Sequence, residues 1–157
     1  MPVDRTTFFE IMSAFPTGVA IVTTLDAEGS PRGLTSNAVC SVSADPPLVL
    51  VCVDRTSRTL PALLAAKGFV VNFVAAGSHE LAARFASKAD DKFDGIDWRP
   101  APSGRPWLHA DAVAYADCVT DQEVEAGDHV ILVGRVEAGR PPGPESQPLM
   151  YFRRSFS

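Results

Sequence analysis

The sequence predicts a mainly β domain in which six or seven antiparallel strands close into a small barrel, with one helix at the front and two short inserted helices. Three observations predict this class. Short β-branched and aromatic runs recur along the chain. Most of them are separated by hairpin-scale turns, which favours antiparallel pairing. With so few strands, closing the sheet also removes exposed strand edges.

Length and charge limit the class of protein. The 157 residues fit one domain spanning residues 1–157, because domains most often run to about 100–150 residues. The net charge of −5 gives no reason to expect nucleic acid, which needs a clustered basic face. No apolar run approaches the roughly 20 residues of a membrane-spanning helix, and the N-terminus lacks the layout of a signal peptide. A cytoplasmic protein without a membrane partner is therefore the expectation.

The front half of the chain is predicted to form a helix followed by strands. A capping-box pattern, Thr7-x-x-Glu10, precedes apolar residues at helical spacing and predicts a helix from about Thr6 to Ala14 that ends before Pro16. Turn signals at Asp26–Gly29 and Asp45–Pro47 separate the strands that follow. The predicted strands are Val19–Leu25, Pro31–Asn37, Val39–Ser43 and Leu48–Val53, the last apolar on both faces.

The second half alternates strands with the two inserted helices. One helix is predicted at Leu60–Ala66 with Ser57 as its cap. The next is predicted to be capped by Ser78, with Leu81, Ala82, Phe85 and Ala86 on its apolar face. The predicted strands are Gly68–Val74, Ala110–Thr120, His129–Ala138 and Leu149–Phe152, with a turn over Asp121–Asp128 and a surface excursion over Arg140–Gln147. Ala89–Pro106 is expected to be irregular, and loops of this length are usually functional or disordered.

The sequence lacks the motifs of several common kinds of catalytic and binding site. The cysteines are odd in number and form no C-x-x-C, so Cys40, Cys52 and Cys118 are interpreted as structural thiols. The three histidines are isolated and have no metal-ligand neighbours, so no metal site is expected. There is no G-x-G-x-x-G after a strand, no phosphate-binding G-x-x-x-x-G-K-[ST] and no G-x-S-x-G elbow.

Three polar clusters remain between the predicted core strands. Thr35-Ser36-Asn37-Ala38 places short side chains where a core strand would carry Val, Ile or Phe, and is either an ordinary turn or a shelf for a flat ligand. Asp54–Thr59 puts hydroxyls and guanidinium groups at a helix N-terminus, which suits a phosphate or a merely capped, solvated loop. Gly127-Asp128-His129 opens a strand, where a histidine is either a hydrogen-bonded edge residue or a functional group.

The residues of these segments and their order along the chain closely resemble sequences of the flavin reductase-like family, over nearly the whole chain. The matching segments are Phe15-Pro16-Thr17-Gly18-Val19, Val22-Thr23-Thr24, Gly33-x-Thr35-x-Asn37-Ala38, Ser41-Val42-Ser43, Asp45-Pro46-Pro47-Leu48, Ser57-x-Thr59, Phe73, Leu81-Ala82-x-x-Phe85, Cys118 and Gly127-Asp128-His129. The family comprises short-chain NAD(P)H:flavin oxidoreductases that partner two-component monooxygenases. The resemblance implies a split β-barrel with Greek-key connections, built as a homodimer.

The resemblance also implies a cofactor, FMN or FAD, and a co-substrate, NADH or NADPH. It places the isoalloxazine ring against Thr35, Ser36, Asn37 and Ala38, with Cys52 and Val53 on the adjoining strand. It places the flavin phosphate at Ser57, Arg58 and Thr59, helped by Arg84. His129 would lie near the nicotinamide as a positioning or proton-supplying group, and Phe152 would cover part of the ring.

The expected reaction is hydride transfer from nicotinamide to flavin N5, in which the protein mainly orients two stacked rings. Free reduced flavin would then diffuse to a partner monooxygenase. Two alternatives stay open: a split-barrel protein that holds FMN tightly as an oxidase of another substrate, such as the pyridoxamine phosphate type, and a flavin- or haem-binding module without turnover. The choices of FMN or FAD and of NADH or NADPH also stay open. The Gly127-Asp128-His129 motif and the Ser41–Pro47 run favour the reductase.

Overall fold

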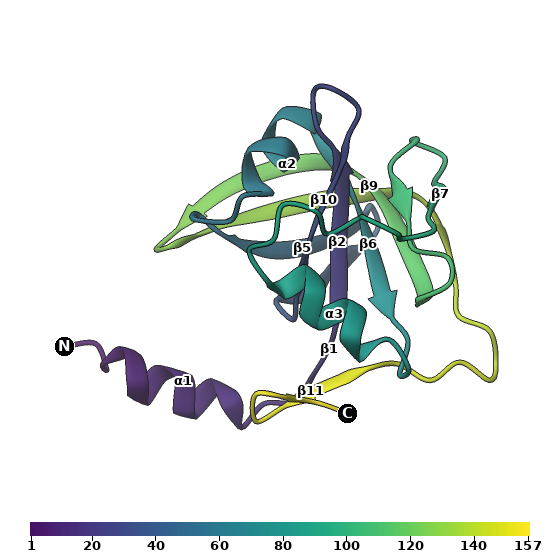
Figure 1. Cartoon of the computed structure of the whole chain (residues 1–157). Coiled ribbons are helices and arrows are strands. Elements are labelled where there is room, and N and C mark those ends of the chain that lie inside the picture. The colour runs from purple at the N-terminus through teal and green to yellow at the C-terminus, as the bar shows by residue number, and fades with distance from the viewer.

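A seven-stranded antiparallel sheet forms the centre of the computed structural model, which describes residues 1–157 (Figure 1). Its strand order is β3-β2-β6-β9-β10-β5-β4. The bounds are β2 Ala20–Leu25, β3 Pro31–Ser36, β4 Val39–Ala44, β5 Pro47–Asp54, β6 Gly68–Val74, β9 Ala112–Ala126 and β10 His129–Arg140. β3 contacts β5 without sharing a ladder, and the amide of Cys52 donates to the carbonyl of Ala38 at 3.0 Å. The mainly β, antiparallel split barrel is confirmed.

The three predicted helices are present as α1 Arg5–Ser13, α2 Leu60–Ala66 and α3 His79–Ala86, but two of the predicted caps are wrong. The Oδ1 atom of Asp4 accepts the amide of Thr7 at 2.8 Å and caps α1, so Thr7 and Glu10 form no capping box. The Oγ atom of Ser57 accepts the amide of Thr59 at 3.2 Å, and Thr59 is the residue that precedes α2. No helix is long and apolar enough to cross a membrane.

The hairpin of β9 and β10 is longer than the sequence predicts. β9 continues to Ala126, so the turn that was predicted over Asp121–Asp128 shrinks to Gly127 and Asp128, with Gly127 at a φ of +57°. The outer half of β9 is exposed, and residues such as Glu123 and Glu125 carry polar side chains. This half extends beyond the barrel (Figure 1). A strand that is solvated on both faces shows no alternation of apolar and polar residues, so the sequence pattern did not indicate this half of β9 as a strand.

Short strands complete the fold. β1 Thr17–Gly18, β11 Met150–Phe152 and β12 Ser155–Phe156 form a separate three-stranded sheet, which confirms the predicted last strand as β11. β7 Arg99–Pro100 and β8 Pro106–Trp107 form a two-stranded ladder inside the segment that was expected to be irregular. Ladders of two residues are too short to leave a period in a sequence.

The core has two parts that share β2. Val22 packs inside the barrel in a cluster that includes Phe69 and Leu132. Ile21, its neighbour in the chain, belongs to the cluster beneath α3 that includes Phe85. β2 is therefore buried on both faces, and β6 has a similar burial pattern. In β5, by contrast, the alternate residues Val49, Val51 and Val53 are buried while Leu48, Leu50 and Cys52 are half-buried, so the two-sided burial expected there is only partial.

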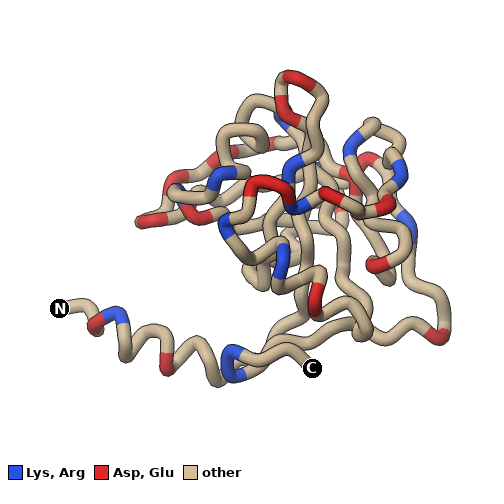
Figure 2. The backbone as a smooth tube through the Cα atoms, viewed as in Figure 1, with Lys and Arg blue, Asp and Glu red and all other residues tan.

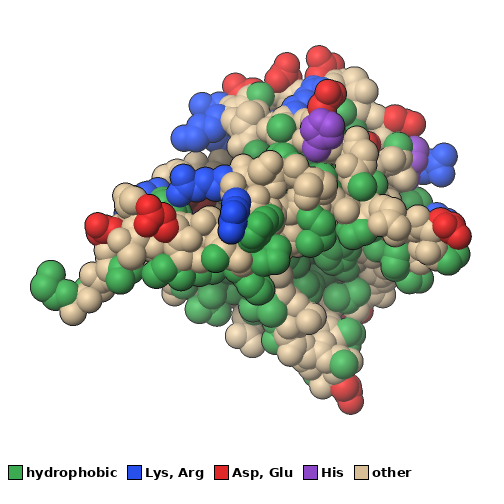
Figure 3. Space-filling model, turned by 90° about the horizontal axis from the view of Figure 1, so that it is seen from below, with side chains coloured by type: hydrophobic (Ala, Val, Ile, Leu, Met, Phe, Trp, Pro, Cys, Tyr) green, Lys and Arg blue, Asp and Glu red, His purple; other side chains and the backbone are tan.

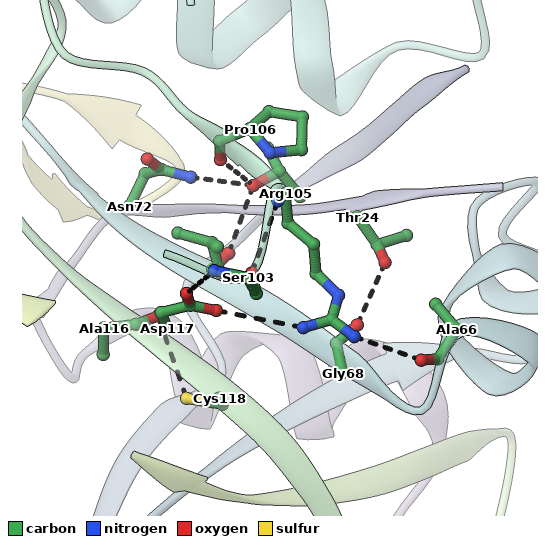
Figure 4. Close-up of polar contacts among 12 residues, drawn as sticks. Thr24, Ala66, Gly68, Asn72, Ser103, Arg105, Pro106, Ala116, Asp117 and Cys118 are labelled. Carbon is green, nitrogen blue, oxygen red and sulfur yellow. Dashed lines mark hydrogen bonds and ion pairs between the residues drawn. The ribbon is translucent and has the colours of Figure 1, made fainter. Parts of the chain in front are cut away.

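Buried polar groups fix the β7–β8 segment to the sheet (Figure 4). The Nδ2 atom of Asn72 donates to the carbonyl of Ile21 and to the Oγ1 atom of Thr23, each at 3.1 Å. The Oδ1 atom of Asn72 accepts the amide of Leu108 at 2.9 Å, and the Oγ1 atom of Thr23 donates to the carbonyl of Pro106 at 2.6 Å. Because Asn72 and Thr23 are fully buried, each of these bonds satisfies a group that water cannot reach.

Arg105 and Asp117 form a second attachment of the same segment (Figure 4). The Oδ2 atom of Asp117 accepts the amide of Ser103 at 2.9 Å, and its Oδ1 atom lies 3.9 Å from Nη1 of Arg105. The Nη2 atom of Arg105 donates to the carbonyl of Ala66 at 3.1 Å. The guanidinium covers Gly68 so closely that a Cβ there would overlap it, so a larger residue at this position would have to displace Arg105 from these contacts.

The three cysteines are free thiols in different surroundings. Cys40 is exposed, Cys52 is half-buried and Cys118 is buried in the barrel core. Burial, followed by the nearby charge of Asp117, raises the pKa of the Cys118 thiol to about 12. Burial also raises the pKa of the Cys52 thiol. Both groups therefore stay protonated near neutral pH and behave as small apolar side chains.

Candidate functional site

A cleft of about 340 Å³ opens between β3, the loop before α2 and the segment after α3. Its volume is within the range of small-molecule sites. Ten of the twelve predicted site residues line it: Thr35, Ser36, Asn37, Ala38, Cys52, Val53, Ser57, Arg58, Thr59 and His129. The other two, Arg84 and Phe152, do not. Residues that are far apart in the sequence therefore converge on one cleft.

The floor of the cleft is the end of β3 and the turn that follows it. The Oγ1 atom of Thr35 donates to the carbonyl of Ala82 at 2.6 Å and holds β3 against α3. The Oγ atom of Ser36 accepts the amide of Ala38 at 3.0 Å. These two hydroxyls are therefore engaged within the protein, whereas the exposed amide of Asn37 makes no side-chain hydrogen bond. Small size and an available amide are what this floor offers a flat ligand.

The loop before α2 forms one end of the cleft and is internally braced. The Oδ1 atom of Asp54 accepts both the amide and the hydroxyl of Thr56 at 2.7 Å, and these bonds lower the pKa of its carboxyl group. The buried hydroxyl of Thr59 donates to the carbonyl of Gly33 at 3.0 Å, which ties the loop to β3. Arg58 extends from the same loop, with its side chain 63% exposed.

Lys92 lines the cleft, although no pattern in the sequence indicates it. Its Nζ atom donates to the carbonyls of Gly33 at 3.1 Å and Phe85 at 2.9 Å, so it links β3 to the end of α3. Burial, followed by the charge of Arg58, lowers the pKa of its ammonium group. The only available signal was the length of the irregular segment Ala89–Pro106, because a single lysine in a polar stretch has no pattern of its own.

His129 lies at the cleft because β10 pairs with β5, in a register that sets His129 opposite Asp54. The Nδ1 atom of His129 is 2.7 Å from Oδ1 of Asp128, and this contact lowers the pKa of the Asp128 carboxyl group. The backbone amide of Arg55 donates to the carbonyl of Asp128, and its Nε atom donates to the carbonyl of Gly127, each at 3.0 Å. The histidine motif and the loop before α2 are thus joined.

Arg84 and Phe152 lie elsewhere in the chain. The Nη2 atom of Arg84 donates to the carbonyls of Asp91 at 2.8 Å and Asp94 at 2.7 Å. These two bonds hold the segment after α3 against the helix. Phe152 is on β11 in the three-stranded sheet, 38% exposed, with the guanidinium of Arg153 5.0 Å from its ring. Within one chain, neither residue reaches the cleft.

The arrangement suits a flat ligand that carries negative charge. Positions of Lys and Arg are interspersed with positions of Asp and Glu along the chain (Figure 2). Four of the cations line the cleft: Arg32, Arg58, Lys88 and Lys92. The floor has small polar residues, and one histidine lies beside the loop before α2. No group of three metal-ligating side chains is present. A planar ring with a phosphate tail, as in a flavin, fits this set of donors.

Comparison with known proteins gives consistent matches. Residues 12–157 match the family model described as flavin reductase like domain. A flavin reductase (NADH) of Kitasatospora aureofaciens is 49% identical over 156 residues, which cover 99% of this chain and 82% of the relative. The reductase subunit HsaB of a flavin-dependent monooxygenase of Mycobacterium tuberculosis is 35% identical, with the same coverage. A solved NADH:FAD oxidoreductase of Streptomyces globisporus, in complex with NAD and FAD fragments, superposes with a TM-score of 0.90 at 34% identity, covering 98% of this chain and 92% of that one.

Proposed function

This chain belongs to the flavin reductase like domain family and is an NAD(P)H:flavin oxidoreductase, and we propose that residues 1–157 act as one domain that binds flavin in the cleft between β3, the loop before α2 and the segment after α3. The observation that carries this placement is the convergence of the β3 floor, the loop before α2 and His129 on a single cleft. These elements come from three separate parts of the sequence, and only the fold brings them together.

The flavin ring is placed on the floor of the cleft and its phosphate at the loop before α2. Residues 35–38 with Cys52 and Val53 leave room for a planar ring because none has a large side chain. Ser57 and Arg58 supply hydroxyl and guanidinium donors for an anion, and Thr59 fixes their loop to β3. Lys92 adds a cation between these two parts.

When bound, flavin supplies the hydride acceptor for NAD(P)H, and the protein supplies orientation. The Asn37 amide and the backbone groups of the floor are positioned to hold the polar edge of the ring. His129 borders the opening where a nicotinamide would enter, and its Asp128 partner fixes the orientation of the imidazole. The bracing bonds of Thr35, Thr59 and Lys92 keep these donors in place before ligands arrive, which reduces reorganisation during hydride transfer.

Steady-state oxidation of NADH with free flavin added is the direct test. A rate that saturates with added FMN or FAD supports a reductase that uses flavin as a substrate. A purified protein with FMN firmly bound, unresponsive to added flavin, would instead favour the oxidase alternative, and absence of any turnover would favour a carrier. Running both flavins against NADH and NADPH in the same assay identifies the preferred pair.

His129→Ala is expected to slow flavin reduction without abolishing it. A hydrogen bond from one side chain is worth about 0.5–1.5 kcal/mol, which corresponds to a roughly two- to tenfold lower kcat/KM for NADH. His79→Ala is the matched control, because His79 is exposed at the start of α3 and outside the cleft. Equal kcat/KM values in His129→Ala and the native protein would remove His129 from the site.

A flavin-dependent monooxygenase is the proposed consumer of the reduced flavin. The support is the relative named as the reductase subunit of such an enzyme, which matches 99% of this chain. Because reduced flavin can diffuse, the two proteins need not form a stable complex. We place the reaction in the cytoplasm, where NAD(P)H is available.

A second copy of this chain is proposed to cover α1. No residue of α1 is buried, and Phe8, Phe9, Ile11 and Met12 are 40–57% exposed. The helix stands away from the barrel (Figure 1), and hydrophobic side chains are prominent on the underside of the molecule (Figure 3). Isolated helices shorter than about 12–15 residues are marginal in water, so α1 needs a partner. Phe152 is near the same helix, because Arg153 donates its amide to the carbonyl of Ser13 at 3.3 Å.

Ile11→Glu is therefore expected to convert a dimer into a monomer of 16.7 kDa in light scattering. The charge would have to be buried without a partner, which is strongly unfavourable. Glu10→Lys, on the same helix, is the control that changes charge at a polar position. A native protein that is already monomeric at micromolar concentration would rule out this interface.

A further inference from the structure

The guanidinium of Arg58 is already engaged with an anion of the protein itself. Its Nη1 atom donates to Oδ1 of Asp90 at 2.7 Å and to the carbonyl of Lys88 at 3.1 Å. Nη1 has only two hydrogens, so both are used. Arg58 belongs to the loop before α2 and Asp90 to the segment after α3, and both line the cleft. The ion pair therefore connects two walls of the cleft at the place where we put the flavin phosphate.

This ion pair can break without unfolding the segment that follows it. Arg84 holds the carbonyls of Asp91 and Asp94, and Lys92 is anchored to Gly33 and Phe85. Release of Asp90 would therefore move only the short stretch of residues 88–90. The side chains of Arg58 and Asp90 are 63% and 84% exposed. Ion pairs with this exposure change equilibria by roughly fivefold at most, so the contact is weak enough to be exchanged.

We propose that Asp90 competes with the flavin phosphate for Arg58. The carboxylate occupies Nη1 of Arg58 when flavin is absent, and phosphate must displace it to pair with that nitrogen. The displaced carboxylate stays near the phosphate and repels it, which favours flavin release. The inference rests on the proposed function, and it makes flavin an exchangeable substrate rather than a firmly held group.

The test compares Asp90→Asn with the native protein in equilibrium titrations with FMN and with riboflavin, followed by flavin fluorescence without nicotinamide. Riboflavin has the same ring and no phosphate. The expected result is an FMN Kd about two- to fivefold lower in the variant, with an unchanged riboflavin Kd. Asp91→Asn is the matched control, because it makes the same charge change one residue away, where the side chain contacts nothing in the cleft. It should leave both Kd values unchanged.

An FMN Kd that is unaltered in Asp90→Asn, or that shifts equally for FMN and riboflavin, overturns the proposal. Repeating the substitution Asp90→Asn in an Arg58→Gln background gives a second, independent test of the competition. The effect of Asp90→Asn should then shrink by at least half, and an undiminished effect would also overturn competition for Arg58. The proposed function fails separately, if the native protein oxidises neither NADH nor NADPH with either flavin, because the titrations need no turnover.

Discussion

Lys92→Met is expected to raise the Kd for FMN about tenfold to a hundredfold. The ammonium group uses two of its three N–H groups on the carbonyls of Gly33 and Phe85, which leaves one for a ligand in the cleft. Hydrogen bonds to charged groups are worth about 1.5–3 kcal/mol each, and the methionine would also leave the link between β3 and α3 unmade. Fluorescence titration with FMN measures the change directly.

Lys88→Met is the control for the loss of one positive charge. Lys88 lines the same cleft, but its side chain makes no hydrogen bond within the protein. Its substitution should therefore raise the Kd for FMN by less than that of Lys92. Equal effects of the two substitutions would show that general electrostatics, and not the anchored position of Lys92, governs affinity.

The lowered pKa of Lys92 adds a pH dependence with a definite sign. Burial brings this pKa below the ordinary value of 10.5, so Lys92 loses its proton before an exposed lysine does. The affinity for FMN should decline as pH rises toward 10.5, relative to riboflavin, and Lys92→Arg should not show this decline. Without flavin, the folded protein binds fewer protons than the unfolded chain between the two pKa values. The contribution of Lys92 to the free energy of unfolding therefore rises with pH in that window.

Asn72→Leu is expected to lower the free energy of unfolding by about 2–5 kcal/mol, because it leaves the buried amide of Leu108 and the hydroxyl of Thr23 without this partner. For a domain of this size, the midpoint of thermal unfolding should fall by about 5–20 °C. Calorimetry of the protein without flavin provides the measurement.

Two further variants separate the network from the general effect of losing an amide. Asn37→Leu makes the same chemical change at an exposed position and should leave the unfolding midpoint nearly unchanged. Thr23→Val removes the other hydroxyl–carbonyl link to Pro106, and the double variant with Asn72→Leu should cost less than the sum of the two. Strict additivity would mean that the two residues do not form one network.

Local patterns predicted the elements, and strand pairing brought most of the site together. Apolar runs such as Gly68–Val74 and the helical spacing around Phe85 matched elements that are buried in the structure. Once β10 pairs with β5, His129 and Asp54 become neighbours. The Gly127-Asp128-His129 motif and the loop before α2, which are far apart in the sequence, therefore lie side by side. Their roles toward flavin stay predictions that the variants above examine.

The parts that escaped prediction depend on contacts between distant residues. Lys92 acquires its position from the carbonyl of Gly33, which is 59 residues earlier in the chain. The family resemblance implies that Arg84 helps to hold the flavin phosphate, but the nearby carbonyls of Asp91 and Asp94 accept hydrogen bonds from its guanidinium. The outer half of β9 is paired and solvated, so its polar sequence resembles a turn. No local pattern distinguishes these cases.

The buried network of Thr23 and Asn72 constrains the order in which the chain can complete its fold. The hydroxyl of Thr23 can form its hydrogen bond only after Pro106, 83 residues later in the chain, has been synthesised. In the same way, Asn72 can bond the amide of Leu108 only after 36 further residues have been added. During synthesis, β2 can pair early with β3 because the two form a hairpin. Docking of the β7–β8 segment must come after β6 has joined them. Ribosome-bound chains that end before Pro106 should therefore hold a paired β2–β3 hairpin with these polar groups still hydrated.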